Sequence, residues 1–226
     1  MTQPLSPYLK PGFYTDALAR GRHRDIVGGR WDETGRAQMA LLQAEGLQPH
    51  HHLLDIGAGS LRLGCKAVPW LDPGHYWGTD LSGALMAEGH AREMADPSRL
   101  DPSHLIEDGD FAFPGVPDTI THALAFAVFT HLPLGTLQHA LARVHLRFPR
   151  LQRLLFTVFL APPGHPGPLR QADGVVTHPG RAPYHFDAAA VLDLTRVTGF
   201  DAMATQTRLP RGQTLFRATR LTAPGA

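Results

Sequence analysis

The segment from Leu53 to Gly64, LLDIGAGSLRLG, constrains the fold of this chain more than any other segment. Its first four residues have the composition of a short buried strand, and a glycine-rich turn then leads into a run with helical character. Gly57 and Gly59 permit a tight turn and allow the backbone to approach a ligand closely. Because the first N–H groups of a helix are unpaired, the segment predicts a ligand site at the carboxyl end of a buried strand.

Short apolar runs alternate with longer amphipathic runs along the rest of the chain. We predict strands at 53–56, 75–79, 104–107, 119–126, 151–160, 200–209 and 214–221, and helices at 16–24, 32–46, 61–71, 83–95, 134–146 and 187–198. This alternation is typical of an α/β fold with a mostly parallel central sheet and helices on both faces. The last two predicted strands flank Pro210-Arg211-Gly212 and indicate a C-terminal antiparallel hairpin.

The length of 226 residues suits one domain. Within a single domain, 1–226, we predict an N-terminal helical cap at 1–49, a ligand-binding core at 50–160 and a C-terminal helix with strands at 187–221. Residues 161–186 interrupt the alternation with six prolines and four glycines, and we interpret them as an insertion or lid. Loops on a rigid scaffold often carry selectivity, so we expect this insertion to determine specificity.

The composition excludes several classes of function. A formal net charge of +1 implies neither a nucleic-acid partner nor a membrane surface. The single cysteine, Cys65, rules out an intrachain disulfide and a cysteine-based zinc site. We expect His50 to His52 to form a solvated loop, and we predict no metal site. The most apolar run, Ala123 to Phe129, is too short to span a bilayer, and residues 1–12 lack the apolar region of a secretory signal. We therefore expect a cytoplasmic protein.

An acidic residue two places before the first glycine helps to identify the ligand. A dinucleotide-binding turn has the pattern G-x-G-x-x-G, whereas here the third glycine is Gly64 and the pattern is G-x-G-x-x-x-x-G. Asp55 would repel a pyrophosphate at the helix N-terminus, but it could receive an ammonium group. The turn thus favours a ligand with a zwitterionic amino-acid tail over NAD, and it disfavours an NAD-dependent oxidoreductase.

The motif Asp55-Ile56-Gly57-Ala58-Gly59 resembles motif I of class I S-adenosylmethionine (SAM)-dependent methyltransferases, and the form G-x-G-S-L-R-x-G is similar to a bacterial subgroup of them. Three further elements of that family follow in order. They are Asp80 at the end of the second predicted strand, Asp110-Phe111 after the third, and the run LAFAVFTHL at 124–132 after the fourth. The resemblance covers roughly residues 30–220. It implies a Rossmann-like methyltransferase fold, with 50–160 as the SAM-binding core.

The resemblance also assigns cofactor-binding roles. The implied residues are Asp55, Gly57, Ala58, Gly59, Asp80, Leu81, Asp110, Phe111 and Phe126. In the family, the carboxylate that corresponds to Asp80 binds both ribose hydroxyls, which suits an acceptor-only group. The pair Asp110-Phe111 would meet the adenine, although Asp108, two residues earlier, is an alternative to Asp110.

The candidates on the substrate side are less specific. His131 is the candidate catalytic residue, because an imidazole can accept a proton near neutral pH if the acceptor must lose one. Its alternative role is to pack the turn before Pro133. We expect Tyr184 and His185 to line the acceptor pocket and Trp31 to cover the cofactor site, with simple packing as the alternative for each. The N-terminal region also holds a basic stretch, for which we predict a solvated helical face, with attraction of an anionic acceptor or RNA as the alternative. Its residues are Arg20, Arg22, His23, Arg24 and Arg30.

The predicted activity is methyl transfer from SAM to an oxygen, nitrogen or carboxylate of a small-molecule acceptor, with S-adenosylhomocysteine (SAH) as the product. The small-molecule class rests on the chain length and the near-neutral charge. Two alternatives remain open at this point. One is a non-catalytic SAM-binding module that regulates a partner, and the other is a methyltransferase that acts on a macromolecule.

Overall fold

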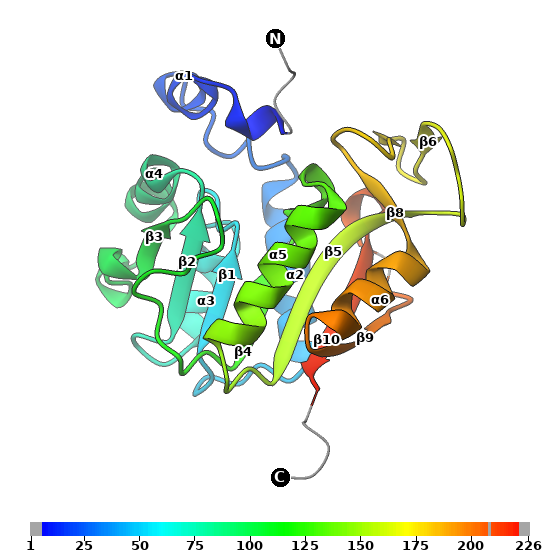
Figure 1. The fold of residues 1–226 in the computed structure, drawn as a ribbon. Coiled ribbons are helices and arrows are strands. Elements are labelled where there is room, and N and C mark those ends of the chain that lie inside the picture. The colour runs from blue at the N-terminus through cyan, green and yellow to red at the C-terminus, as the bar shows by residue number, and fades with distance from the viewer. Residues whose placement is uncertain (1–5, 208, 222–226) are drawn as a thin grey trace.

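A computed structural model describes residues 6–207 and 209–221, and its centre is an eight-stranded sheet (Figure 1). The strands run in the order β3-β2-β1-β4-β5-β10-β9, with β8 paired to β5 beside this path. Their bounds are β1 Leu53–Ile56, β2 Tyr76–Asp80, β3 Leu105–Glu107, β4 His122–Ala125, β5 Arg153–Ala161, β8 His185–Asp187, β9 Phe200–Ala204 and β10 Thr214–Arg220. The strands from β3 to β5 are parallel, whereas β10 is antiparallel to both β5 and β9.

Helices cover both faces of this sheet (Figure 1). Their bounds are α1 Phe13–Ala19, α2 Trp31–Ala44, α3 Gly64–Trp70, α4 Gly83–Glu93, α5 Leu134–Arg147 and α6 Ala188–Val197. Short 3-10 helices lie between them, among them η1 Pro7–Leu9 and η4 Phe129–His131. No helix among the described residues is both long enough and apolar enough to cross a membrane.

Because helices bury both faces of the sheet, its central strands have continuous runs of apolar residues in the sequence. All four residues of β1 are buried, including Asp55. One apolar cluster packs α5 and α6 against one face, and a second packs α2 and α3 against the other. The central β5 joins the parallel part to the antiparallel part, where Phe156 stacks on Phe216 of β10 at 5.2 Å between ring centroids.

The predicted fold class is confirmed: the sheet is mostly parallel, helices lie on both faces, and β9 and β10 form the C-terminal antiparallel pair. Two helix predictions were misplaced. The first helix ends at Ala19 instead of Arg24, because Gly21, Gly28 and Gly29 adopt positive φ and the chain turns repeatedly there. The third begins at Gly64 instead of Leu61, because Leu61 itself has φ 61°.

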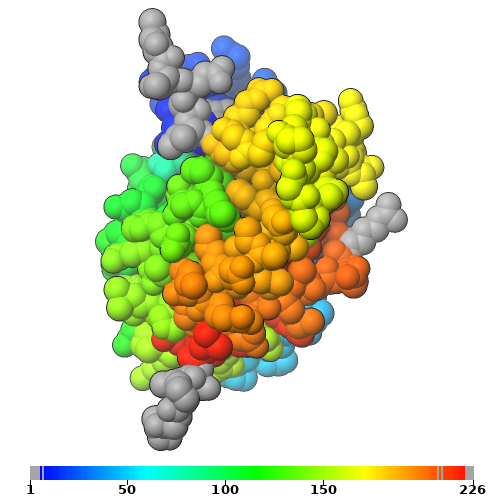
Figure 2. Space-filling view, turned by 45° about the vertical axis from the view of Figure 1, so that its right-hand side comes forward, coloured from blue at the N-terminus to red at the C-terminus, as the bar shows by residue number. Residues whose placement is uncertain are grey.

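The insertion at 161–186 lies at the same end of the molecule as the N-terminal segment (Figures 1 and 2). Within it, β6 (Leu169–Arg170) and β7 (Val176–Thr177) form a small antiparallel hairpin. Its last residues rejoin the sheet, because β8 pairs in parallel with the carboxyl end of β5. Asp187 then caps α6 as predicted, its carboxylate accepting from the Ala189 N–H at 2.8 Å.

Candidate functional site

The turn after β1 has a shape that requires glycine. Gly57 and Gly59 have φ of 76° and 57°, a region that residues with a side chain adopt only under strain. The N–H groups of Gly57 and Ala58 both donate to the Thr79 carbonyl of β2, at 2.7 and 3.0 Å. A Cβ on Gly57 would meet Val128, and one on Gly59 would lie 2.6 Å from Cγ1 of Val27. The turn is therefore fixed against the carboxyl end of the neighbouring strand.

Asp80, at the end of β2, is bonded directly to this turn. Its Oδ2 accepts from the Gly59 N–H at 2.9 Å, and its Oδ1 accepts from the Ser82 N–H at 3.1 Å. Burial raises the pKa of this carboxyl to about 6, while the backbone donors around it act in the opposite direction. Each oxygen keeps a further lone pair, so Asp80 can still accept two hydroxyl donors. Leu81, which follows, lies against Gly109.

Asp55 lies in the interior behind the turn. Its side chain is only 3% exposed, and its Oδ2 accepts from the Tyr76 hydroxyl at 2.8 Å. Burial raises the pKa of Asp55 to about 7, against the lowering effects of that hydrogen bond and of the Arg62 charge. Asp55 thus joins the interior of the turn to β2, and its contact with a ligand ammonium remains a prediction.

In the loop after β3, the two carboxylates that are candidates for binding adenine have different surroundings. The carboxylate of Asp108 stabilises the loop itself, because it accepts from the N–H groups of Asp110, Ala112 and Phe113 at 2.8 to 3.2 Å. The side chain of Asp110 is exposed. Phe111 follows with φ 60° and packs against Phe129, so Asp108 shapes the loop that presents Asp110 and Phe111.

His131 ends η4, the short helix after β4. Burial lowers the pKa of its imidazole to about 4, so the ring is neutral at neutral pH. Its Nδ1 is buried and has no hydrogen-bond partner among the described residues. The ring meets that of Tyr8 edge-to-face, with 4.8 Å between centroids and 83° between planes. Phe126, five residues earlier, is buried in the apolar cluster that includes Leu155.

The other three predicted substrate-side residues are buried, each in different surroundings. The Tyr184 N–H donates to the Thr130 carbonyl beside His131 at 2.7 Å, but its ring packs in the interior parallel to Phe186. The His185 Nδ1 is 2.8 Å from the Thr177 hydroxyl of the insertion. Trp31 begins α2 and lies under the guanidinium of Arg24, 5.3 Å from the ring centroid. Their roles toward a ligand remain predictions.

Sequence reasoning missed the contacts between the N-terminal segment and the turn after β1. The Ser60 hydroxyl donates to the His23 carbonyl at 2.9 Å, and Nη1 of Arg62 donates to the carbonyls of Val27 and Gly29 at 2.8 and 3.4 Å. Ser60 and Arg62 belong to the glycine motif itself, and polar side chains at these positions could have indicated contacts with another segment. Tyr8 lies before the first periodic pattern in the sequence, so no sequence signal indicated its role.

The basic residues at 20–30 do not lie on a helix as predicted, although all of them except the buried His23 are exposed to solvent as predicted. Residues 20–30 form turns, and several of the basic side chains there are paired. Glu93 of α4 accepts from both Nε and Nη2 of Arg24, at 2.7 and 2.6 Å, and lies 2.7 Å from Nε2 of His23. These pairs fasten the N-terminal segment to α4.

The histidines at 50–52 are less solvated than predicted. His51 stacks on His122 with centroids 4.4 Å apart, and His52 stacks on His75 at 3.9 Å. Burial and neighbouring imidazoles lower the pKa of both His51 and His52. They lie where β1 begins, at the opposite end of this strand from the glycine turn.

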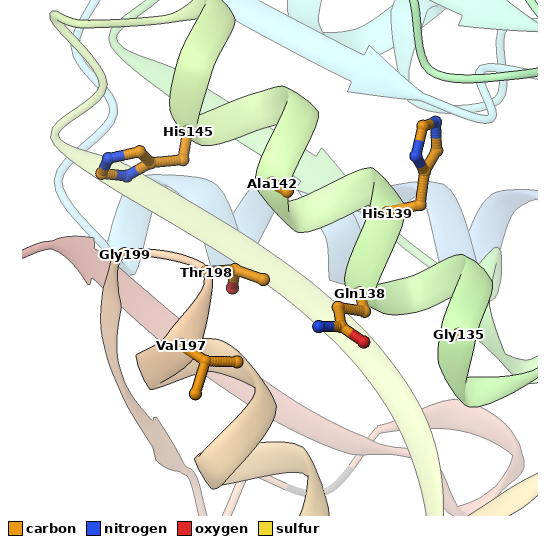
Figure 3. A pocket seen from close by; sticks show the side chains of 8 residues that line it. All are labelled: Gly135, Gln138, His139, Ala142, His145, Val197, Thr198 and Gly199. Carbon is orange, nitrogen blue, oxygen red and sulfur yellow. The ribbon is translucent and has the colours of Figure 1, made fainter.

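Among the described residues, some open hollows lie outside this turn. One, of about 520 Å³, lies between α5 and the end of α6 and is lined by Gly135, Gln138, His139, Ala142, His145, Val197, Thr198 and Gly199 (Figure 3). Another, of about 470 Å³, is formed by the N-terminal segment and includes Tyr8 and Phe13. The first shares no residue with the turn after β1, so we locate the candidate site by the turn, Asp80 and His131.

No protein-family model matches the chain. Solved structures with a similar fold include a 1,6-didemethyltoxoflavin-N1-methyltransferase from Burkholderia thailandensis, with bound 1,6-didemethyltoxoflavin and SAH. It aligns with a TM-score of 0.63 over 98% of this chain and 94% of its own, at 17% identity. Magnesium protoporphyrin IX methyltransferase from Synechocystis PCC 6803, with bound SAH, aligns with a TM-score of 0.61 over 92% and 96%, at 18% identity. The chain therefore has the Rossmann-like fold of SAM-dependent methyltransferases.

Proposed function

We propose that this protein is a SAM-dependent methyltransferase that methylates an oxygen, nitrogen or carboxylate of a small-molecule acceptor and releases SAH. A fold of this kind serves many activities, so the proposal needs support from the site. The observation that carries it is the hydrogen bond from the Gly59 N–H to Asp80. This bond joins a turn shaped for close ligand approach to a carboxylate that retains acceptor capacity, at the carboxyl ends of two adjacent parallel strands.

The residues present fit SAM. Asp80 would accept the ribose hydroxyls, and the exposed Asp110 with the backbone of Phe111 would meet the adenine. The turn from Asp55 to Gly59 would receive the amino-acid tail, with Leu81 and Phe126 beside the cofactor. When bound, SAM supplies a methyl group on a sulfonium, and the protein's task is then to align the acceptor and exclude water.

His131 is the proposed residue on the acceptor side. Because burial lowers its pKa to about 4, its imidazole is unprotonated at neutral pH and can accept a hydrogen bond from an acceptor group, although it is a weaker base than an ordinary histidine. The unpartnered Nδ1 is the atom proposed for that contact. We also propose that Tyr184, His185 and the insertion determine which acceptor binds. We propose that Trp31 covers the cofactor site.

The proposed small-molecule class draws support from the structural neighbours. Their names identify 1,6-didemethyltoxoflavin and magnesium protoporphyrin IX, both small molecules, as substrates. No comparable observation favours a regulatory module or a macromolecular acceptor for this chain.

Calorimetric titration of the purified protein with SAH, and separately with NAD, tests the cofactor assignment. We expect saturable one-to-one binding of SAH and no binding of NAD, because Asp55 and the glycine spacing disfavour a pyrophosphate. Binding of NAD without binding of SAH would overturn the proposal. Binding of SAH without methyl transfer to any acceptor would replace it with a non-catalytic module.

A further inference from the structure

An aromatic residue of the N-terminal segment packs against the acceptor side of the proposed site. Tyr8, in η1, packs its ring against His131 at 4.8 Å and against Phe13 at 5.1 Å. Tyr14 stacks on it at 6.4 Å. Burial, and to a lesser extent the negative charge of Asp80, raises the pKa of the hydroxyls of both Tyr8 and Tyr14. Tyr8 therefore lies beside the proposed acceptor-side imidazole.

The motif I turn holds the segment that carries this tyrosine. Arg62 is 8% exposed and donates to the carbonyls of Val27 and Gly29, residues more than thirty positions away. Val27 in turn packs its side chain onto Gly59, at the centre of the turn. Both bonds come from the same nitrogen, Nη1, and removal of the guanidinium would leave both carbonyls without this donor. The placement of the N-terminal segment thus depends on a residue of the cofactor motif.

We propose that Tyr8 contacts the ligand in the methyl-transfer site and favours a cationic sulfonium, and that Arg62 is the positioning residue that holds Tyr8 there. This inference rests on the proposed function. A ligand held by Asp80 whose reacting end lies at His131 meets the ring of Tyr8, since that ring packs against His131. Aromatic faces attract cations, so Tyr8 contributes more to binding SAM, which carries the sulfonium, than to binding SAH, which lacks it.

The test is the ratio of SAM affinity to SAH affinity, measured by calorimetry on the full chain. We expect Tyr8→Ala to lower this ratio at least fivefold and Tyr8→Phe, which keeps the ring, to leave it within twofold of wild type. Arg62→Ala should lower the ratio as Tyr8→Ala does, with partial recovery in Arg62→Lys. The double variant should match Tyr8→Ala alone, because Arg62 acts through Tyr8.

Arg99→Ala is the matched control. Arg99 also donates to a distant backbone carbonyl, that of Leu71, at 3.1 Å. Leu71 follows the C-terminus of α3, whereas the glycine turn precedes the N-terminus of that helix. Arg99→Ala should lower the melting temperature and leave the affinity ratio unchanged. Equal loss of SAM and SAH affinity in Tyr8→Ala would show a merely structural role and overturn the inference, as would additive losses in the double variant. A wild-type protein that binds neither ligand would overturn the proposed function, and this inference with it.

Discussion

Asp80→Asn separates the binding role of this residue from its structural role. The substitution keeps the shape of the side chain but removes its charge and one of its two acceptor oxygens. In the wild-type protein those oxygens hold the N–H groups of Gly59 and Ser82 and, by our proposal, the two ribose hydroxyls. Losing charge-assisted hydrogen bonds worth ~1.5–3 kcal/mol should raise the Kd for SAH roughly 10- to 150-fold.

The expected effect of Asp80→Asn on stability is small, because two contributions oppose each other. Raising the pKa of this carboxyl from 3.8 to about 6 costs the native state about 3 kcal/mol at neutral pH, and the amide escapes that cost. One backbone N–H loses its acceptor, at a cost of ~1–3 kcal/mol. The free energy of unfolding at pH 7.5 should therefore stay within about 2 kcal/mol of wild type.

The pH dependence of Asp80→Asn has a definite sign. Because the native pKa of Asp80 lies above its unfolded value, its contribution to stability is full below pH 3.8 and is lost as the pH rises through about 6. The wild-type protein should thus lose stability relative to Asp80→Asn between pH 4 and 6. Denaturant unfolding at several pH values and calorimetry with SAH measure both effects, with Asp118→Asn, an exposed carboxylate before β4, as the control. An Asp80→Asn protein that is folded and binds SAH within twofold of wild type would refute the reasoning.

Three further predictions concern the same site. Gly59→Ala should abolish SAH binding and lower the free energy of unfolding by roughly 1–3 kcal/mol. An alanine at this φ of 57° is strained and its Cβ meets Val27, and unchanged SAH binding by calorimetry would contradict the prediction. His131→Gln should lower kcat and leave SAH affinity unchanged. It should also flatten the loss of wild-type stability from pH 6.5 down to 4, since burial lowers the pKa of His131 to about 4. Asp108→Ala should destabilise the fold by roughly 2–3 kcal/mol in denaturant melts, whereas Asp110→Ala should weaken only SAH binding; the reverse pattern would exchange their roles.

The parts of the site set by local sequence could be predicted. The bounds of β1 match the prediction, because a short apolar run before a glycine turn leaves little choice of conformation. Asp80 also lies where predicted, since parallel strands bring their carboxyl ends to one edge and the spacing sets the end of β2. The positive φ of Gly57 and Gly59 agrees with the tight turn that their pattern predicts.

The parts set by long-range contacts could not be predicted. The left-handed conformation of Leu61 delays the start of α3, and no propensity of leucine indicates it. The choice between Asp108 and Asp110 depends on which side chain turns back onto its own loop. The contact of Tyr8 with His131 joins residues more than 120 positions apart, and only the fold brings them together.

The proposed activity is tested most directly by incubating the purified protein with methyl-labelled SAM and a size-fractionated extract of its native host. We predict that label enters the small-molecule fraction in the presence of the wild-type protein and not with Asp80→Asn at limiting SAM, and that SAH accumulates in equal amount. Label in RNA or protein would keep the chemistry and contradict the small-molecule class. SAM binding without label in any fraction would contradict the methyltransferase itself.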